Sequence, residues 1–430
     1  MKQPDHIAAI RALRDLWHFA GDAGQRGGAR QMTDTIRVAM RGRGKLNDVV
    51  GELRRQIDAR VDFVADCREM SVKVGDDGKV RIMPSDSLRD FMPREGVVLL
   101  DQALTQLAGR IATPMPIKFT RQAIEAAPRR WEDYVTGVMH DLPKRWLMRL
   151  LDDKVRAVLS DRFRIIESLD VAKAALEGAL QTDGVRVIEA SITDSHLRIK
   201  FVNPEVWAAL TEFSATAGDH EFLKPGANAS PTWLRNMPGI EDVKLQGGPT
   251  TLWPIVTIGN SDTGHGLNSA KIGAAQGICM NLATIETMVA NVHLGQRMEL
   301  GMFGADTISA EAKAIALKSR DVVKAAFDEE KFRAMVERCK KTDSSKVAAP
   351  ATAMKNLIKV SGGTLYETDL DALVAAFSKE RDTVYGVGQA VARLAQDVPD
   401  VDRATHLEEF AGSVLVGKHS RAIQAMPVMS

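Results

Sequence analysis

The sequence predicts an α+β fold: a small antiparallel or mixed sheet backed by a long helix, with helical N- and C-terminal regions. Two alternating apolar runs, residues 185–193 and 196–202, predict a β-hairpin. A β-rich apolar run at 252–258 predicts a third strand, and the segment 266–292, rich in Ala, Ile and Met, predicts the long helix. Together these elements form a β-β-β-α unit at the centre of the chain.

The composition excludes several classes of protein. The chain has 430 residues, and 57 Lys and Arg against 56 Asp and Glu give no overall charge typical of a nucleic-acid or membrane surface. No apolar stretch approaches the roughly 20 residues of a membrane span, and the N-terminus lacks a signal-type apolar core. We therefore expect a cytoplasmic protein without a membrane partner. The dispersed cysteines, Cys67, Cys279 and Cys339, exclude a disulfide framework and a CxxC-type zinc site.

We divide the chain into an N-terminal region (1–95), a central domain (96–302) and a C-terminal helical region (303–430). Apolar residues at three- and four-residue spacing predict an amphipathic helix over residues 1–20, and residues 46–60 also read as helical. The first 60 residues of the N-terminal region are therefore expected to be helical, apart from the stretch that separates these two segments.

That stretch, residues 21–45, is the most basic segment of the chain and is interspersed with glycines. A flexible Gly/Arg-rich backbone suits phosphate contact because guanidinium groups fork onto phosphate oxygens. A solvated linker is the alternative, since short basic runs are common on protein surfaces. Its cations are Arg26, Arg30, Arg37, Arg41, Arg43 and Lys45, against the acids Asp22 and Asp34.

Residues 61–83 predict a second hairpin, because β-rich runs flank a turn from Gly75 to Gly78. Residues 204–250 are loop-like in composition, and a loop of that length inside a domain is usually functional or disordered. Three helices are expected between these landmarks, at 96–111, 119–126 and 169–179.

The C-terminal region predicts mostly helix. Apolar residues at helical spacing over 308–340 indicate one long amphipathic helix or two in line, followed by a polar linker at 341–352. Two more helices are expected at about 352–359 and 368–396. The tail, residues 406–430, is expected to be partly ordered at best.

Residues 129–164 interleave aromatic side chains with nine basic and six acidic residues. Aromatic rings beside Arg and Lys suit single-stranded nucleic acid, because bases stack on the rings while the cations meet the phosphates. The alternative is that Trp131 and Trp146 are core residues of two short helices. The candidate nucleic-acid contacts are Arg129, Arg130, Trp131, Lys144, Arg145, Trp146, Arg149, Arg156, Arg162 and Arg164.

The loop after the third predicted strand, residues 259–266, places small polar groups between glycines that can adopt positive φ. Such a loop can hold a ligand or an anion. Alternatively it only starts the next helix, whose first N–H groups Asn268 or Ser269 would cap. The polar candidates in the loop are Asn260, Ser261, Asp262 and His265.

Several of these segments together resemble the phage/plasmid-like proteins known as domain of unknown function 932, over roughly residues 96–300. The resemblance rests on LSDRFR at 159–164 with ESLDVAKAAL after it, NSDTGHG at 260–266, CMN at 279–281, and His293-Leu294-Gly295. Asp262 stands where the family usually has Glu, and Leu282 stands where it has Gly. The family implies a mobile-element context, near genes for single-strand binding and recombination, but no chemistry.

The β-β-β-α topology also resembles the core of phage single-strand annealing proteins, in which a curved sheet backed by a helix lines a basic groove and protomers form rings or filaments. These observations lead to our main hypothesis. The protein is expected to bind single-stranded DNA for a phage or other mobile element, to anneal strands as an extension of that activity, and to form a homo-oligomer. No cofactor or metal is expected.

Two other hypotheses remain open. A metal-dependent enzyme acting on nucleotides or DNA would use Asp262, His265 and His293, although no HxxxH, paired Asp-x-Asp, G-x-S-x-G or Walker motif fixes such a geometry. An oligomeric interaction or assembly protein would use the helices at 308–340 and 368–396 as its partner surface.

Overall fold

We analysed a computed structural model of the chain. It describes residues 39–40, 46–111, 114–163, 165–203, 205–209, 251–264, 269–276, 282–283, 305–398 and 400–425. The predictions for residues 1–38 and for most of 204–250 and 277–304 lie outside these ranges, as do Arg164 and His265. The described residues contain both helices and strands, which confirms the α+β class.

Residues between 60 and 160 form sheet B, whose six strands follow the order β2-β6-β7-β5-β4-β3. Neighbouring strands are antiparallel except β5 and β7, which run parallel. Sheet B draws strands from both sides of the boundary predicted at residue 95. Its strands are β2 (Arg60–Asp66), β3 (Met70–Val74), β4 (Val80–Pro84), β5 (Val97–Leu99), β6 (Arg145–Leu151) and β7 (Lys154–Ser160), with short 3-10 turns η1 (Cys67–Glu69) and η2 (Asp86–Leu88).

The predicted hairpin around Gly75 to Gly78 is confirmed as β3 and β4, and Gly78 takes a φ of 72° in the turn. The helix expected over 96–111 is wrong at its start. Val97 to Leu99 form β5, which lies between β4 and β7, and the helix begins only at Asp101. Strand pairing on both sides of the two valines outweighs the helical pattern.

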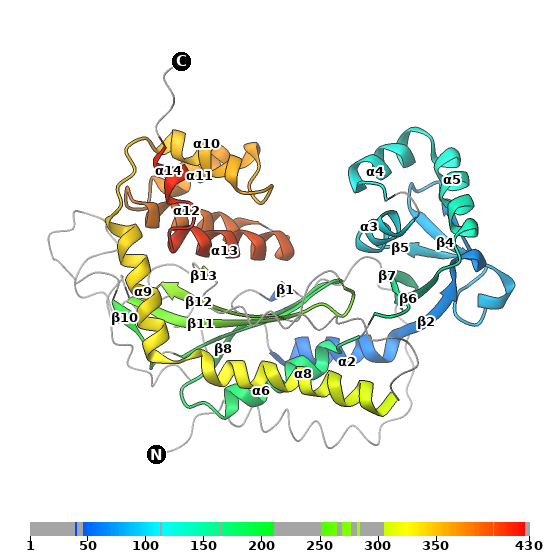
Figure 1. Cartoon of the computed structure of the whole chain (residues 1–430), viewed down its shortest axis with the longest axis horizontal. Helices are drawn as coiled ribbons and strands as arrows, with labels where there is room; N and C mark the ends of the chain where they lie inside the picture. The colour runs from blue at the N-terminus through cyan, green and yellow to red at the C-terminus, as the bar shows by residue number, and fades with distance from the viewer. Residues whose placement is uncertain are drawn as a thin grey trace.

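Two helices pack against sheet B, α3 (Asp101–Arg110) and α5 (Pro128–Asp141), and α4 (Ile117–Ala126) packs on these two. The sheet and these helices occupy the right of Figure 1. Their shared core includes Ile82, Met139 and Met148, each 0 % exposed. The prediction of a helix at 119–126 is confirmed by α4.

Sheet A is the larger sheet, with the strand order β1-β8-β9-β11-β12-β13 and β10 paired to β11, all antiparallel. The predicted hairpin at 185–202 is confirmed as β8 and β9, and the predicted third strand is β11. The strands are β1 (Ala39–Met40), β8 (Arg186–Ile192), β9 (Leu197–Val202), β10 (Ala208–Ala209), β11 (Thr251–Asn260), β12 (Ser269–Gln276) and β13 (Leu282–Ala283).

The long helix predicted over 266–292 is wrong wherever the structure describes that segment. Residues 269–276 form β12, which pairs with β11 from Gly259↔Ser269 to Leu252↔Gln276. Alanine favours helix only weakly, and a long antiparallel partner overrides that preference. Alternate burial of Ala270, Ile272 and Ala274 fits the strand equally well.

Other helices cover the back of sheet A: α2 (Leu46–Ala59), α6 (Ser168–Leu180) and α8 (Ala305–Ala326). They lie below the sheet in Figure 1. Phe201, Val256 and Ile258 reach this side of the sheet and are each 0 % exposed. The sheet is therefore backed by helices, as predicted, but by α6 and α8 instead of residues 266–292.

The C-terminal helices are α9 (Glu329–Ser344), α10 (Pro350–Val360), α11 (Leu370–Phe377), α12 (Val384–Asp397), α13 (Val401–Leu415) and α14 (Ser420–Gln424), with a 3-10 turn η4 (Glu367–Asp369). The segment 308–340 is two helices, because Asp328 caps α9 by accepting from the Lys331 N–H. The helix expected at 368–396 is divided between α11 and α12. The expectation of a loosely ordered tail is wrong for α13, whose Leu407, Ala411 and Val414 are each 0 % exposed.

Helix α13 meets the face of sheet A opposite α6 through charged side chains. Arg198 pairs with Asp402 at 2.5 Å, and the Lys200 ammonium lies 2.7 Å from Glu408. Burial alone would lower the pKa of Lys200, but Glu189 and Glu408 outweigh it and raise the pKa. No helix within the described ranges is long and apolar enough to span a bilayer.

Candidate functional site

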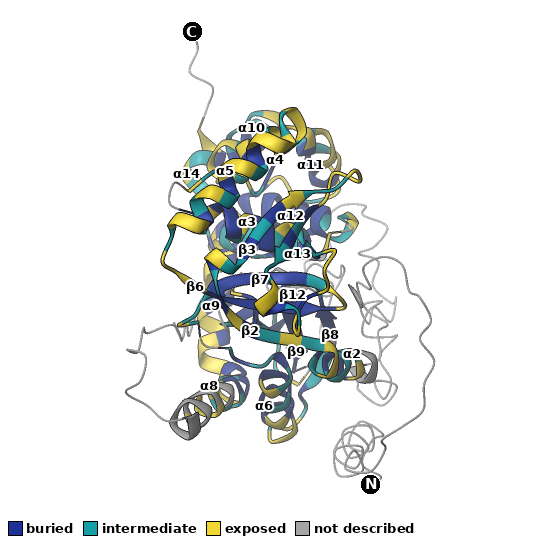
Figure 2. Cartoon of the chain, turned by 90° about the vertical axis from the view of Figure 1, so that its right-hand side faces the viewer, coloured by how far each residue is buried: buried dark blue, intermediate teal, exposed yellow. Residues whose placement is uncertain are grey.

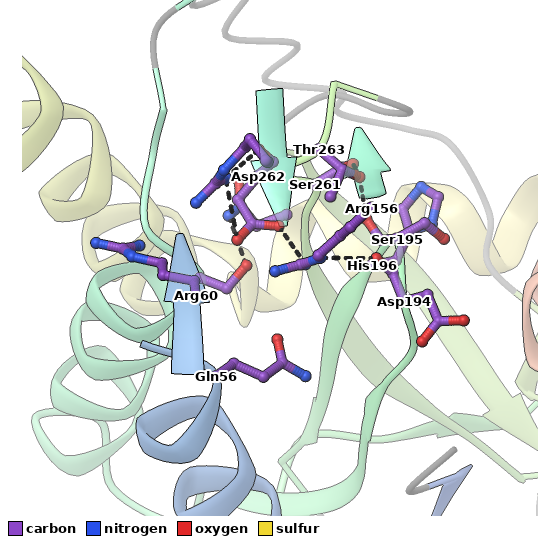
Figure 3. Close-up of polar contacts among 12 residues, drawn as sticks. Gln56, Arg60, Arg156, Asp194, Ser195, His196, Ser261, Asp262 and Thr263 are labelled. Carbon is purple, nitrogen blue, oxygen red and sulfur yellow. Dashed lines mark hydrogen bonds and ion pairs between the residues drawn. The ribbon is translucent and has the colours of Figure 1, made fainter. Parts of the chain in front are cut away.

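The polar loop that follows β11 lies buried between the two sheets (Figure 3). The Asn260 amide donates to the Ile166 carbonyl at 2.9 Å and to the Ser168 hydroxyl at 3.0 Å, which fixes the start of α6. Thr263 accepts from the side chains of Gln102 and Gln106 of α3. The loop thus connects sheet A to the helix that covers sheet B.

Asp262 is the centre of this connection, and it joins two of the predicted nucleic-acid contacts. Its carboxylate accepts from Arg156 at 2.8 Å and lies 3.3 Å from Arg149. The Arg149 guanidinium also donates to both carboxylate oxygens of Asp62 on β2, each at 3.0 Å. We call these four residues the Asp262 clamp.

Three of the four clamp residues are sealed from solvent, and Asp62 is partly exposed. Arg149 is 1 % exposed, Arg156 is 4 % exposed and Asp262 is 6 % exposed. Burial alone would lower the pKa of Arg149, but the charges of Asp262 and Asp62 outweigh it and raise the pKa. Since removing one partner of a buried pair typically costs about 3–5 kcal/mol, the clamp is a strong tie between the sheets.

Four of the predicted nucleic-acid contacts are therefore corrected. Arg149 and Arg156 are buried in ion pairs of the clamp, and Trp131 and Trp146 are buried in the core, at 4 % and 3 % exposed. Trp131 lies on the buried side of α5 with Val135 and Met139, at helical spacing. Buried rings offer no face to a base and paired guanidinium groups offer no charge to a phosphate.

The other predicted cations remain on the surface. Arg129 and Arg130 are exposed in the first turn of α5, and Lys144 and Arg145 are exposed at the start of β6. Arg162 is exposed in the turn after β7. Unlike Arg149 and Arg156, none of these five enters an ion pair within the described part of the chain.

Helix α5 also closes an edge of sheet B. The Thr136 hydroxyl accepts from the Val72 N–H at 3.1 Å, and the Glu132 carboxylate accepts from the Val74 N–H at 2.6 Å. His140 Nε2 lies 3.2 Å from the Met70 carbonyl. Residues four apart on a helix are separated by about 6 Å along its axis, and residues two apart on a strand by about 6.6 Å. Side chains at every fourth position of α5 can therefore reach every second residue of β3. We call the side chains of Glu132, Thr136 and His140 the edge ladder.

Two exposed aromatic residues lie on α4 and α5, and neither was among the predicted contacts. Phe119 of α4 is 57 % exposed and Tyr134 of α5 is 45 % exposed. Tyr134 stands four residues after Arg130, so both occupy one outward side of α5. The signal was present in the sequence, because Tyr134 stands among the arginines of the basic segment and outside the spacing of Trp131, Val135 and Met139.

A cleft of about 970 Å³ lies where the β3–β4 turn, α3 and α4 face the β8–β9 turn and the start of α13. Its lining is mixed in charge and selects no single class of ligand. The cations are Lys79, Arg121 and Lys154, and the carboxylates are Asp76, Asp101, Glu125, Asp194, Asp400 and Asp402.

Ser195, His196 and Asp402 meet beside this cleft, but not in the arrangement of a hydrolytic triad. The Ser195 hydroxyl donates to Asp402 at 2.9 Å and lies 2.7 Å from His196 Nδ1. The same nitrogen faces the Asp402 carboxylate at 3.5 Å. Because serine and aspartate approach one nitrogen, the imidazole cannot relay a proton between them. Burial alone would raise the pKa of Asp402, but His196 and Arg198 hold it well below its ordinary value.

The metal-enzyme hypothesis gains no support from the residues that can be placed. Asp262 is engaged by two arginines, while His265 and His293 lie outside the described ranges. Within those ranges no group of three or more His, Cys, Asp or Glu side chains is arranged to hold a metal ion.

No protein-family model, curated protein or solved structure matches this chain. The resemblance to the phage/plasmid-like proteins therefore stays a prediction from the sequence.

Proposed function

We propose that the protein binds single-stranded DNA through the outward surface of α4, α5 and the start of β6. Its members share exposure and either a positive charge or an aromatic ring. We call this the basic–aromatic surface: Phe119, Arg129, Arg130, Tyr134, Lys144 and Arg145.

The observation that carries the proposal is the pairing of ring and cation on one side of α5. An exposed aromatic ring offers a flat apolar face on which a base can stack. Arg130 beside Tyr134 supplies the charge that the adjoining phosphate requires. Figure 2 shows exposed residues along the outer surface of α5.

The length of the surface suits a short stretch of strand. Helix α5 has 14 residues and is therefore about 21 Å long. Arg129 and Arg130 lie at its start, and Lys144 and Arg145 follow its end. Cations at both ends with a ring between them fit backbone contact and stacking without sequence preference, at a few nucleotides per protomer.

The wider setting is proposed from the sequence resemblance. A role in recombination or replication of a phage or other mobile element, in the host cytoplasm, follows from the phage/plasmid-like motifs. Strand annealing would require two bound strands to meet, and therefore more than one copy of the chain. Neither step requires a cofactor or a metal.

Fluorescence anisotropy with labelled poly-dT and with the same length of duplex tests this proposal. We expect single strands to bind more tightly and binding to weaken as salt rises. The variant Tyr134→Ala should weaken binding about fivefold or more, while Tyr134→Phe keeps the ring and should bind as the wild type does. Arg129→Ala with Arg130→Ala should reduce the salt slope by about 1.4, because each phosphate that is no longer neutralised removes about 0.7 from it.

A matched control removes two cations elsewhere. Lys355 and Lys359 are exposed on α10, so Lys355→Ala with Lys359→Ala changes the net charge equally without touching the basic–aromatic surface. An equal decrease in affinity in both double variants would show that binding follows net charge alone. A folded wild-type protein that fails to bind poly-dT at low salt would contradict the proposal.

A further inference from the structure

Among the described residues, the strand β2 lies at the outer edge of sheet B and has β6 as its only neighbour in the sheet. The Cys67 N–H donates to the Lys144 carbonyl at 3.0 Å, so the N–H groups of alternate residues before it, including Phe63, face β6. Asp62 and Val64 consequently turn their N–H groups outward. Among the backbone hydrogen bonds of the described residues, none uses either of these two groups.

The sequence of β2, Arg-Val-Asp-Phe-Val-Ala-Asp, is complementary to itself when read antiparallel. With Phe63 opposite Phe63 of a second copy, Asp62 faces Val64 and each can donate and accept across the junction. Arg60 then stands opposite Asp66, a pair of opposite charges, and apolar Val61 stands opposite Ala65. Cross-strand pairs of this kind stabilise antiparallel sheets.

Other registers fail on simple grounds. If the register of the two β2 strands is shifted by one residue, a residue whose N–H points outward stands opposite a residue whose N–H points to its own β6. The hydrogen bonds between the two copies then cannot form. A shift of two residues places Asp62 opposite Asp62 in one direction and opposite Asp66 in the other. Like charges directly opposite are destabilising. The two-fold register centred on Phe63 is therefore favoured.

The side chains around this edge also suit contact. Val61 and Val64 are 39 % and 38 % exposed, and Phe91, which stacks on Phe63 at 4.6 Å, is 43 % exposed. The one carboxylate in the middle of the strand, Asp62, is already neutralised by Arg149. Covering the edge would therefore bury apolar surface without leaving an unpaired charge.

We propose that a second copy of this chain adds its β2 to this edge, which joins two six-stranded sheets into one around a two-fold axis. Seven-residue strands bury little area, so the dimer is weak and depends on concentration. The α5 residues that test nucleic-acid binding are separate from this edge, because α5 lies along β3 at the opposite edge of the sheet. Lys144 and Arg145 instead lie beside the end of β2, where Arg145 is the strand partner of Asp66. The failure of either proposal leaves the other standing.

Sedimentation velocity of the full-length protein, from about 1 µM to about 300 µM, tests the pairing. The test variant is Val64→Pro, which removes an outward N–H that has no partner in the described part of the protomer, and the control is Val64→Thr, which keeps it. Wild type and Val64→Thr should pass from monomer to dimer, and Val64→Pro should dimerise at least about tenfold more weakly. A wild type that stays monomeric throughout, or a Val64→Pro variant that dimerises equally well, would overturn the proposal.

A cross-link gives a second test that does not depend on the proline variant folding. Residues 61 and 65 of opposite copies form a non-hydrogen-bonded pair, whose Cα atoms lie about 4.5 Å apart, within reach of a disulfide. Val61→Cys with Ala65→Cys should give a covalent dimer under mild oxidation, and Val61→Cys alone should not. Monomer only in the double variant, or equal cross-linking in both, would count against this register.

Discussion

The two edges of sheet B end in opposite ways. At β3, the edge ladder of α5 takes up the outward backbone groups of Met70, Val72 and Val74. At β2, the outward N–H groups of Asp62 and Val64 meet no such side chains among the residues that the structure describes. The end of the strand is closed, because the Asp66 N–H donates to Glu69 at 3.2 Å. One edge of a single sheet is sealed and the other is available.

The contrast shows how a helix can replace a missing strand. Polar side chains at four-residue spacing follow the two-residue repeat of the strand closely enough to meet each outward group in turn. Strand β2 is held differently: β6 pairs with one side of its backbone and the Asp62 side chain belongs to the Asp262 clamp, whereas the outward N–H groups of Asp62 and Val64 have no partner among the described residues. Folded proteins usually cover their edges, so an edge left open is a candidate for pairing.

The largest expected effect comes from releasing the clamp that holds β2. Asp262→Ala leaves Arg149 and Arg156 buried without their shared carboxylate, so the free energy of unfolding should fall by about 3–5 kcal/mol. Urea unfolding followed by circular dichroism measures the decrease. Asp133→Ala, a change at an exposed residue of α5, is the control and should stay within about 0.5 kcal/mol of wild type. Equal stability of the two variants would mean that the clamp contributes nothing.

A pair of prolines compares the two edges directly. Val72→Pro removes an N–H that donates to Thr136 and should cost about 2–3 kcal/mol of unfolding free energy, because a strand hydrogen bond is lost and a half-buried hydroxyl loses its partner. Val64→Pro removes an N–H that has no partner in the described part of the protomer and should cost less than about 1 kcal/mol. Thermal unfolding of dilute samples supplies both values. The comparison fails if Val64→Pro is the more harmful change.

A milder change opens the sealed edge without touching the strand. Thr136→Val keeps the shape of the side chain but removes the acceptor for the Val72 N–H, so we expect the free energy of unfolding to fall by about 1–2 kcal/mol. Thr136→Ser restores the hydroxyl and should recover most of it. Hydrogen exchange of the Val72 amide measures the same hydrogen bond locally. An unchanged exchange rate in Thr136→Val would show that the Val72 N–H is already hydrogen-bonded to water in the wild type.

The smallest effect is a pH dependence at the end of β2. Hydrogen bonds from Arg68 lower the pKa of Asp66 to about 2, below its ordinary value of about 3.9. A carboxyl group whose pKa is lower in the folded state stabilises the fold at every pH above its pKa in the unfolded state. For Asp66 this contribution disappears as the pH falls from about 4 through 2. The Arg68 amide, which donates to Asp66, should exchange faster across that window, whereas exchange at Val72 should not follow it.

Local patterns in the sequence were enough for some elements and not for others. Alternation and turn residues predicted both hairpins, and helical spacing predicted α4 and α6. Residues 269–276 were mistaken for helix because Ala270, Ile272 and Ala274 suit either structure until β11 is known to lie beside them. The choice between helix and strand for this segment depends on its pairing with β11, which local sequence patterns do not reveal.

The candidate site divides in the same manner. Exposure of Arg129, Arg130, Lys144 and Arg145 agrees with the charge pattern of the segment. The burial of Arg149 and Arg156 depends on Asp262, more than a hundred residues later, so the basic segment and the polar loop could not be recognised as two halves of one clamp. The edge ladder had a readable signal in the polar four-residue spacing of Glu132, Thr136 and His140.

Hydrogen exchange of backbone amides tests the difference between the edges most directly, at a protein concentration where the monomer dominates and at one where the dimer does. We predict that the Val72 and Val74 amides are protected equally at both concentrations, because α5 serves them within each protomer. The Asp62 and Val64 amides should exchange rapidly in the dilute sample and become protected in the concentrated one. Fast exchange of Asp62 and Val64 at every concentration, or protection of both in the monomer, would contradict the account.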